Sequence, residues 1–248
     1  MSSTTAGRPA GAALRGRVAV VTGATRGIGR ATAVRRAGAG ARVVVVARGA
    51  GALAELAAEL GGDALAMPCD LADRAAVGAA ADALRQRIGA APDVLVNNAG
   101  LFALAPLAET APEQFAATID TNLVAPFLLL RAVLPGMRER GTGHVVTVGS
   151  IADRAAFPEN GAYAASKFGA RAMHEVLRAE LRGSGIRATL VSPGPVDTPL
   201  WDPIGPDTRP GFTPRAAMLP ADAVADAILW AVTRPEGTNV DELRLSRS

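Results

Sequence analysis

Short valine-rich runs alternate with helix-like segments along nearly the whole chain. The runs expected to form strands lie at 17–23, 41–48, 63–70, 92–100, 143–150, 186–194 and near 239–246. The helices expected between them lie at 28–40, 51–60, 73–89, 112–140, 161–184 and 221–233. Strands that are apolar throughout must be covered on both faces, and helices between successive strands supply that cover. The pattern therefore predicts an α/β fold with one doubly wound parallel sheet.

The chain is expected to form one domain, because no repeat or linker divides its 248 residues. The first 15 residues are small and polar and lack the apolar core of a signal peptide. They are expected to form a flexible arm before a domain at 16–248. A stretch at 195–219 is rich in proline and glycine and too long for an ordinary connection, which predicts a lid.

The composition argues against several classes of protein. The net charge is only +3 and the arginines are scattered, so no nucleic-acid partner is expected. Cys69 is the single cysteine, which excludes an internal disulfide and favours a reducing, cytoplasmic location. No apolar run reaches the roughly 18 residues of a membrane span. His144 and His174 stand apart, so no metal site is expected.

The stretch "TGATRGIG" (22–29) places three glycines where the first strand turns into the first helix. Gly23, Gly27 and Gly29 would let the backbone approach a ligand closely, and the free N–H groups of the helix N-terminus attract a pyrophosphate. The spacing G-x-x-x-G-x-G differs from the common dinucleotide fingerprint. Taken alone, a purely structural turn explains it equally well.

Polar residues also follow the next strands. "NNAG" (97–100) ends the fourth expected strand and Asp70 ends the third. Ligands of open parallel sheets bind at the carboxyl ends of the strands, so these residues are expected at the same site. Ordinary asparagine and aspartate turns are the alternative. The positions of the asparagines argue against simple turns. Of the five in the chain, three fall where a cofactor would bind, namely Asn97, Asn98 and Asn122.

The only tyrosine and the only lysine of the chain, Tyr163 and Lys167, are four residues apart. On a helix they would lie one above the other. Ser150 ends the preceding strand, 13 residues upstream of Tyr163, within reach of the same space. Ser, Tyr and Lys beside a nicotinamide can carry out carbonyl chemistry. A hydrolase is disfavoured because no G-x-S-x-G surrounds Ser150.

Taken together, "TGATRGIG", "NNAG", Asn122, Ser150, "YAASK" and "SPGPVDTP" resemble the short-chain dehydrogenase/reductase family in its single-domain branch. The resemblance runs from about residue 16 to the end and implies a Rossmann-like fold. It implies that Tyr163 is the general acid in reduction and the base in oxidation. It further implies that Ser150 holds the substrate carbonyl, that Lys167 binds the nicotinamide ribose, and that Asn122 holds a water that relays protons to Lys167.

The lysine suggests how Tyr163 would work at neutral pH. A cation about 4 Å from the phenol, at an effective dielectric near 20, contributes roughly 4 kcal/mol, or about three pKa units. The pKa of Tyr163 is therefore expected to fall from about 10 to about 7, where acid–base catalysis is most efficient.

The resemblance also implies the residues that bind the cofactor. Thr198 and Val196 would bind the carboxamide and Asp70 the adenine, while Asn98 is expected mainly to brace neighbouring strands. The full expected set is Gly23, Thr25, Arg26, Gly27, Ile28, Gly29, Arg48, Asp70, Leu71, Asn98, Ala99, Gly100, Tyr163, Lys167, Pro193, Gly194, Val196 and Thr198.

The end of the second strand favours NADP(H) over NAD(H). Enzymes that prefer NAD usually carry an acidic residue there, which binds the ribose 2′-hydroxyl. Here that position is Ala47, followed by Arg48, and Arg26 lies in the glycine turn. Two guanidinium groups without an opposing carboxylate suit a 2′-phosphate. The alternative is that both are ordinary arginines in an arginine-rich chain.

The expected substrate pocket is apolar. Residues 101–106, 151–160 and 199–219 would line it with Phe102, Leu104, Phe157, Trp201, Phe212, Met218 and Leu219. This favours an apolar or aromatic ketone or alcohol over a sugar or an acyl-carrier substrate. Arg154, Arg209 and Arg215 could bind an acidic group but are expected to be solvated.

An NADPH-dependent carbonyl reductase is therefore the leading prediction. An NAD-dependent alcohol dehydrogenase and a non-catalytic NADPH-binding regulator are the alternatives, and the intact Ser150, Tyr163 and Lys167 favour an enzyme. A homotetramer is expected. The helix at 161–184 carries small and apolar residues away from the site that allow close helix packing, namely Ala164, Ala165, Phe168, Ala172, Met173 and Val176.

Overall fold

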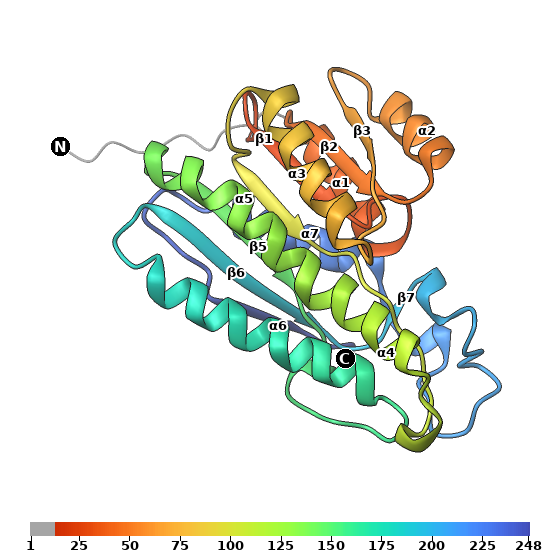
Figure 1. The fold of residues 1–248 in the computed structure, drawn as a ribbon. Helices are drawn as coiled ribbons and strands as arrows, with labels where there is room; N and C mark the ends of the chain where they lie inside the picture. Colours follow the sequence, from red (N-terminus) through yellow and green to blue (C-terminus); the bar gives the residue numbers. More distant parts are fainter. Residues whose placement is uncertain (1–12) are drawn as a thin grey trace.

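A seven-stranded parallel sheet forms the centre of the molecule. The computed structural model describes residues 13–248, and the sheet has the order β3-β2-β1-β4-β5-β6-β9, with every neighbouring pair parallel (Figure 1). The strands are β1 (Val18–Thr22), β2 (Arg42–Ala47), β3 (Leu65–Pro68), β4 (Val94–Asn97), β5 (Gly143–Val148), β6 (Ile186–Pro193) and β9 (Glu242–Leu245). The predicted α/β fold is thus confirmed, and each expected strand is present with slightly narrower bounds.

Helices cover both faces of this sheet. On one face α1 (Gly27–Gly38), α2 (Ala50–Leu60) and α7 (Ala221–Val232) pack on one apolar core, with α1 against α7. On the other face α3 (Arg74–Ile88), α5 (Ala125–Arg140) and α6 (Gly161–Glu180) pack on a second core. The apolar strands thus have a core on each side, as their continuous hydrophobicity requires.

The helical region predicted at 112–140 contains an irregularity. It consists of α4 (Pro112–Ile119), a π-helical turn (Asp120–Val124) and α5. By length and composition this stretch is apolar enough to cross a membrane, and it is the one such helix among residues 13–248. However, 44% of its most apolar window is buried, and α5 packs on α3 within the domain. A helix packed in a protein core can be equally long and apolar, so this stretch is no evidence for a membrane span.

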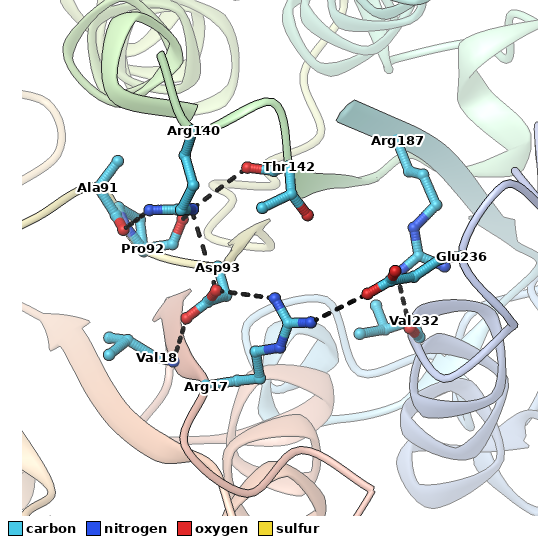
Figure 2. Close-up of polar contacts among 10 residues, drawn as sticks. All are labelled: Arg17, Val18, Ala91, Pro92, Asp93, Arg140, Thr142, Arg187, Val232 and Glu236. Atoms are coloured by element: carbon cyan, nitrogen blue, oxygen red, sulfur yellow. Dashed lines mark hydrogen bonds and ion pairs between the residues drawn. The ribbon is translucent and has the colours of Figure 1, made fainter. Parts of the chain in front are cut away.

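A cluster of polar contacts around Asp93 joins the starts of β1 and β4, at the end of the sheet opposite the cleft described below (Figure 2). Asp93 accepts hydrogen bonds from the Val18 amide at 2.7 Å and from Arg17 Nη1 at 3.1 Å. Arg17 also reaches Glu236, and Arg140 at the end of α5 lies 3.9 Å from Asp93. One carboxylate therefore ties together the start of β1, the entry to β4 and the end of α5.

The predicted N-terminal arm is only partly within the described residues. Its first twelve residues lie outside them. Residues 13–15 belong to a turn, in which Leu14 is buried in the core and donates its amide to Ala39 O at 2.9 Å. The predicted arm therefore extended too far, because Leu14 fills a core position.

The stretch at 195–219, read as irregular from the sequence, is tied down at its base. The short strands β7 (Val196–Asp197) and β8 (Leu219–Pro220) pair with each other and bring its two ends together. Between them, Arg215 Nη1 donates to Asp197 at 2.8 Å and to Thr198 O at 3.1 Å. Arg215 Nη2 also donates to Asp202. The predicted lid thus has an anchored base, and its outer part, 200–213, follows the rim of the cleft described next.

Candidate active site

A large cleft opens where β1, β2, β4, β5 and β6 end. The strand order reverses between β1 and β4, and ligands of open α/β sheets bind at this point, beyond the carboxyl ends of the strands. The cleft has a volume of about 1020 Å³. The segments that follow β4, β5 and β6 lie at the same end of the molecule (Figure 1). The topology thus brings together "NNAG", Ser150 and "SPGPVDTP", which are far apart in the sequence.

The glycines of the turn after β1 are required by close contacts. Gly23 and Gly27 have φ values of +64° and +53°, which favour glycine. A Cβ on Gly29 would come within 2.1 Å of the Gly23 carbonyl oxygen, and one on Gly27 within 2.9 Å of Thr198 Cγ2. Gly23 and Gly27 line the cleft, whereas Gly29 lies behind it. The turn is therefore a tight cradle of the kind that a pyrophosphate needs, and Gly29 shapes it without facing the ligand.

The end of β2 presents positive charge to the cleft. Ala47, Arg48 and Arg26 line the wall here, and Arg26 is the residue that precedes α1. Within the described part of the chain neither guanidinium is paired with a carboxylate. Two unpaired cations suit a phosphate on the ribose, and Ala47 stands where a carboxylate would accept from a 2′-hydroxyl.

The asparagine after β4 braces the strands, as predicted. Asn98 Nδ2 donates to Thr22 O at 2.8 Å, and the Thr22 hydroxyl accepts from the amides of Asn98 and Ala99 at 3.0 Å. These bonds fix the loop after β4 beside the glycine turn. Asp70, Leu71, Asn98, Ala99 and Gly100 all line the cleft.

Ser150, Tyr163 and Lys167 meet on the cleft wall. Ser150 follows β5, and Tyr163 and Lys167 lie on successive turns of α6. The ammonium of Lys167 lies 5.5 Å from the centroid of the Tyr163 ring and donates to Val148 O at 2.8 Å. The Ser150 hydroxyl accepts from the Ala152 amide at 3.2 Å, and Ser150 lines the same wall as Tyr163. The three residues thus lie together, as their spacing in the sequence predicts.

The expected lowering of the Tyr163 pKa is wrong for this arrangement. Burial raises the pKa of Tyr163 to about 12, outweighing the neighbouring Ser150 side chain, which lowers it. Burial also lowers the pKa of Lys167 to about 8, against the nearby Asp153, which raises it. The ammonium is bound to the Val148 carbonyl rather than to the phenol, so its charge does not offset the desolvation of Tyr163. At neutral pH Tyr163 is a neutral hydrogen-bond donor beside a largely protonated Lys167.

Asn122 lies in the π-helical turn between α4 and α5 and is buried. Its amide accepts from the Leu101 N–H at 2.7 Å and donates to Leu101 O and to Ser166 Oγ, both at 2.9 Å. Asn122 therefore ties the loop after β4 to α6 next to Lys167, but it is not part of the cleft wall. A π turn often marks a functional position, since it redirects one side chain. The predicted water relay at Asn122 stays a prediction.

A buried carboxylate that the sequence did not single out holds Ser150 in place. Asp153 accepts from the Ser150 amide at 3.2 Å, from the Ser192 hydroxyl, and from Arg154 Nε at 2.9 Å, and Arg171 lies 3.6 Å away. A Cβ at position 149 would come within 2.4 Å of this carboxylate, which explains the glycine before Ser150. Asp153 thus joins the end of β5 to β6 and α6, and the S-x-x-D capping pattern at 150–153 was the available signal.

The substrate side of the cleft is bounded by an aromatic ladder, formed by Tyr163, Phe102, Trp201 and Phe212. Neighbouring ring centroids are 4.7, 5.1 and 6.3 Å apart along this order, each pair in an edge-to-face arrangement. Trp201 Nε1 donates to Val196 O at 3.0 Å, which fixes the ladder to the base of the lid. A continuous aromatic surface therefore leads from the candidate proton donor to the rim.

Two of the residues predicted for the substrate pocket do not line it. Met218 is fully buried and Leu219 belongs to the core, because the return of the lid into β8 carries both beneath the surface. Phe102, Leu104, Phe157, Trp201 and Phe212 line the cleft as expected.

The three arginines expected to be solvated are instead engaged in ion pairs. Arg154 pairs with Asp153 and Glu242, and Arg215 clamps the base of the lid. Arg209 pairs with Glu159, a lining residue that the sequence did not reveal.

The two histidines are core residues. His144 Nε2 and Thr189 Oγ1 lie 2.8 Å apart, and His174 Nδ1 lies 2.9 Å from Thr147 Oγ1. Burial lowers the pKa of both, that of His174 to about 4, so both are neutral at pH 7. Neither lines the cleft.

Comparisons with known proteins relate the sequence to dehydrogenases and reductases. A family model described as short chain dehydrogenase matches residues 17–209. An NADP-dependent 3-hydroxy acid dehydrogenase of Salmonella typhi is 34% identical over 157 residues, which are 61% of this chain and 63% of that protein. The curated relatives are matched over 18 to 63% of their own length.

Solved structures are matched more completely. A metagenomic short-chain oxidoreductase in complex with NADP has a TM-score of 0.82 and 34% identity, and the match covers 96% of this chain and 99% of that one. An alcohol dehydrogenase from Thermococcus sibiricus, complexed with 5-hydroxy-NADP, has a TM-score of 0.82 and 30% identity over 92% of this chain and 95% of its own. Fold and sequence thus agree over nearly the full length of both chains.

Proposed function

Because the chain belongs to the short-chain dehydrogenase/reductase family of oxidoreductases, we propose that it is an NADPH-dependent carbonyl reductase. In the reverse direction it would act as an alcohol dehydrogenase. Its substrates would be apolar or aromatic ketones and the corresponding alcohols. The observation that carries this proposal is the placement of Ser150, Tyr163 and Lys167 on one cleft wall. The glycine cradle lies on one side of them and the aromatic ladder on the other.

The cofactor would lie along the ends of β1, β2 and β4. The cradle of Gly23 and Gly27 would receive the pyrophosphate, and Arg26 and Arg48 the 2′-phosphate. NADPH would supply a hydride to the carbonyl carbon. The relatives solved with NADP or a derivative of it support this choice over NAD.

Ser150 and Tyr163 would act on the substrate oxygen. Ser150 Oγ would donate a hydrogen bond to the carbonyl oxygen and stabilise the alkoxide as it develops. Tyr163 would donate its phenolic proton to that oxygen, a role suited to its raised pKa of about 12, which keeps it protonated. Lys167, with its pKa lowered to about 8, would supply positive charge beside the phenolate that forms.

A non-catalytic NADPH-binding regulator is the weaker alternative. Such a protein would need the cradle but not a serine hydroxyl, a phenol and an ammonium converging beside it. The same three groups would serve an NAD-dependent alcohol dehydrogenase, so the choice of cofactor depends on Arg26, Arg48 and Ala47.

We further propose a homotetramer in the cytoplasm. On α6 the side chains of Ala165, Phe168, Ala172 and Val176 lie on one outward stripe, with Phe168 43% and Val176 57% exposed. The other two residues expected on this face do not lie there, because Ala164 is buried and Met173 packs on the core. Phe115 and Phe127 are also exposed on the neighbouring α4–α5 stretch. Apolar side chains gathered on two packed helices favour burial against another copy.

The test is NADPH consumption against a panel of aryl ketones, aliphatic ketones, aldehydes and diketones. The expected result is turnover that is highest with aryl ketones and lost in Tyr163→Phe, with NADPH binding to that variant nearly unchanged. Tight NADPH binding without turnover on any carbonyl would favour the regulator. Near-normal turnover in Tyr163→Phe would refute the assignment of the proton donor.

A further inference from the structure

An ion pair closes the outer end of the aromatic ladder. Arg209, in the outer part of the lid, donates through Nη2 to the carboxylate of Glu159. Glu159 lies in the loop between β5 and α6, and both residues line the cleft. The pair therefore bridges the two segments that border the substrate side, with each partner a little over one third exposed.

The outer substrate side of the cleft carries no other charge. This side is formed by the lining residues within 101–104, 150–163 and 200–213. Apart from Glu159 and Arg209, the lining side chains of these three segments are uncharged. Lys167 lies deeper, bound to the Val148 carbonyl beside Tyr163. The far end of a substrate would thus meet one cation and one anion that neutralise each other.

The pair is held in a fixed place. The Arg209 guanidinium carbon lies 4.9 Å from the centroid of the Phe212 ring, the last member of the ladder. Glu159 has φ of +63° and is the one non-glycine residue with positive φ within 13–248. Its carbonyl accepts from the Ala105 amide at 2.9 Å, which fixes this unusual backbone. Both charges are thus positioned by neighbours rather than free to move apart.

We propose that the Glu159–Arg209 pair is a specificity element, which restricts the pocket to carbonyl compounds without a charge at the end remote from the carbonyl. This inference rests on the proposed function. A substrate carboxylate at that end would have to displace Glu159 from Arg209 while facing the repulsion of the displaced Glu159. An ammonium at the same end would have to displace Arg209. A neutral ring leaves the pair intact and lies against Phe212.

The test uses para-acetylbenzoate and its methyl ester, two aryl ketones that differ in charge at the remote end. The wild-type protein is expected to reduce the ester and to disfavour the carboxylate. Glu159→Gln leaves Arg209 unpaired while a side chain of the same length keeps the backbone unchanged. It should shift the kcat/KM ratio toward the carboxylate by about fivefold, the upper range for a partly exposed charge pair. Arg209→Gln should shift the ratio further toward the ester.

Two controls separate this effect from a general loss of stability. The double variant Glu159→Arg with Arg209→Glu restores a neutral pair and should restore the preference for the ester. Glu59→Gln breaks an exposed pair with Arg30 outside the cleft and should leave the ratio unchanged. Equal ratios in the wild-type protein, Glu159→Gln and Arg209→Gln would overturn the inference.

Binding provides a second readout that does not need turnover. Trp201 is in the ladder, and the only other tryptophan, Trp230, lies on α7 outside the cleft. Quenching of Trp201 fluorescence should therefore give dissociation constants for both probes in the presence of NADP⁺, which cannot reduce them, with the same expected ratios. Binding of the ester without its reduction would refute the proposed function while still testing the pair. Failure of the ester to bind to the wild-type protein would overturn both proposals.

Discussion

Asp153→Asn should destabilise the protein far more than its small change in shape implies. One carboxylate oxygen of Asp153 accepts from the Ser150 amide and the Ser192 hydroxyl, and the other lies against Arg154 and Arg171. An asparagine has one oxygen and one NH₂ group, so one of these two sets of donors would face another donor. A buried group left without its partner costs about 1–3 kcal/mol, and loss of one partner of a buried ion pair about 3–5 kcal/mol.

The surroundings of Asp153 place the expected loss of stability near the boundary between these two ranges. Arg154 and Arg171 are 23% and 26% exposed, and both retain Glu242, so water and Glu242 would compensate for part of the lost charge. We expect a loss of about 2–3 kcal/mol in the free energy of unfolding, or a Tm lower by about 5–10 °C for a domain of this size. Because Ser150 loses its anchor, kcat should also fall, by about tenfold, which is less than the roughly 10²–10³ lost when such a donor is removed outright.

Thermal unfolding followed by circular dichroism at pH 7 gives the first quantity, and steady-state reduction gives the second. The matched control is Asp82→Asn, which breaks a pair with Arg85 in which both side chains are 68% exposed, and should change stability by less than about 1 kcal/mol. A Tm for Asp153→Asn within the range of this control would show that the buried network contributes nothing. A lower Tm with unchanged kcat would show that Asp153 stabilises the fold without positioning Ser150.

Three further predictions concern the proton, the cofactor and the assembly. The pKa of Lys167 is lowered to about 8, so the kcat for reduction should fall as the pH rises through 8 and the ammonium loses its proton. Lys167→Arg should be slower than the wild-type protein but should not show this decline. A wild-type pH profile that stays flat to pH 10 would contradict the role assigned to Lys167. NADPH should be preferred over NADH by about 2–3 kcal/mol, a factor of roughly 30 to 150 in kcat/KM. The double variant Ala47→Asp with Arg48→Ala should erase or reverse this preference. Equal kcat/KM values for the two cofactors in the unmodified protein would contradict the predicted preference. Light scattering at micromolar concentration should give a tetramer, and Phe168→Glu with Val176→Glu should dissociate it; a wild-type species of 25.1 kDa would refute the assembly.

The elements of this fold were predictable because each rests on a local signal. The run "VAVVT" is buried apart from its first residue, and "RVVVVA" apart from its first and last residues, as fully covered strands require. The glycines that follow the first run mark the turn into α1. The π-helical turn at Asp120–Val124 left no such signal, because it differs from the flanking α-helix by a shift in hydrogen bonding, not by composition. The sequence therefore indicates a helix at Asn122 but not the turn that directs its side chain toward Leu101.

The parts of the site that were missed depend on contacts between distant segments. Glu159 and Arg209 are 50 residues apart, and Asp153 and Ser192 are 39 apart. In a chain with 26 basic residues, nothing local distinguishes an arginine that borders a pocket from one that faces solvent. Met218 was assigned to the pocket because it lies in the apolar part of the lid, but the pairing of β7 with β8 turns it inward.

The Tyr163–Lys167 pair shows where sequence spacing stops being informative about chemistry. The four-residue spacing correctly predicted that the two side chains lie together, since helical geometry alone decides this. It did not predict that the ammonium donates to the Val148 carbonyl, which comes from the end of β5 and is brought there by the fold. It also gave no measure of burial, which opposes the charged form of both groups and raises the pKa of Tyr163 while lowering that of Lys167. A phenol that keeps its proton at neutral pH, beside a lysine that begins to lose its charge near pH 8, is ready to donate a proton rather than to accept one, which is the role that the proposed carbonyl reduction requires of Tyr163.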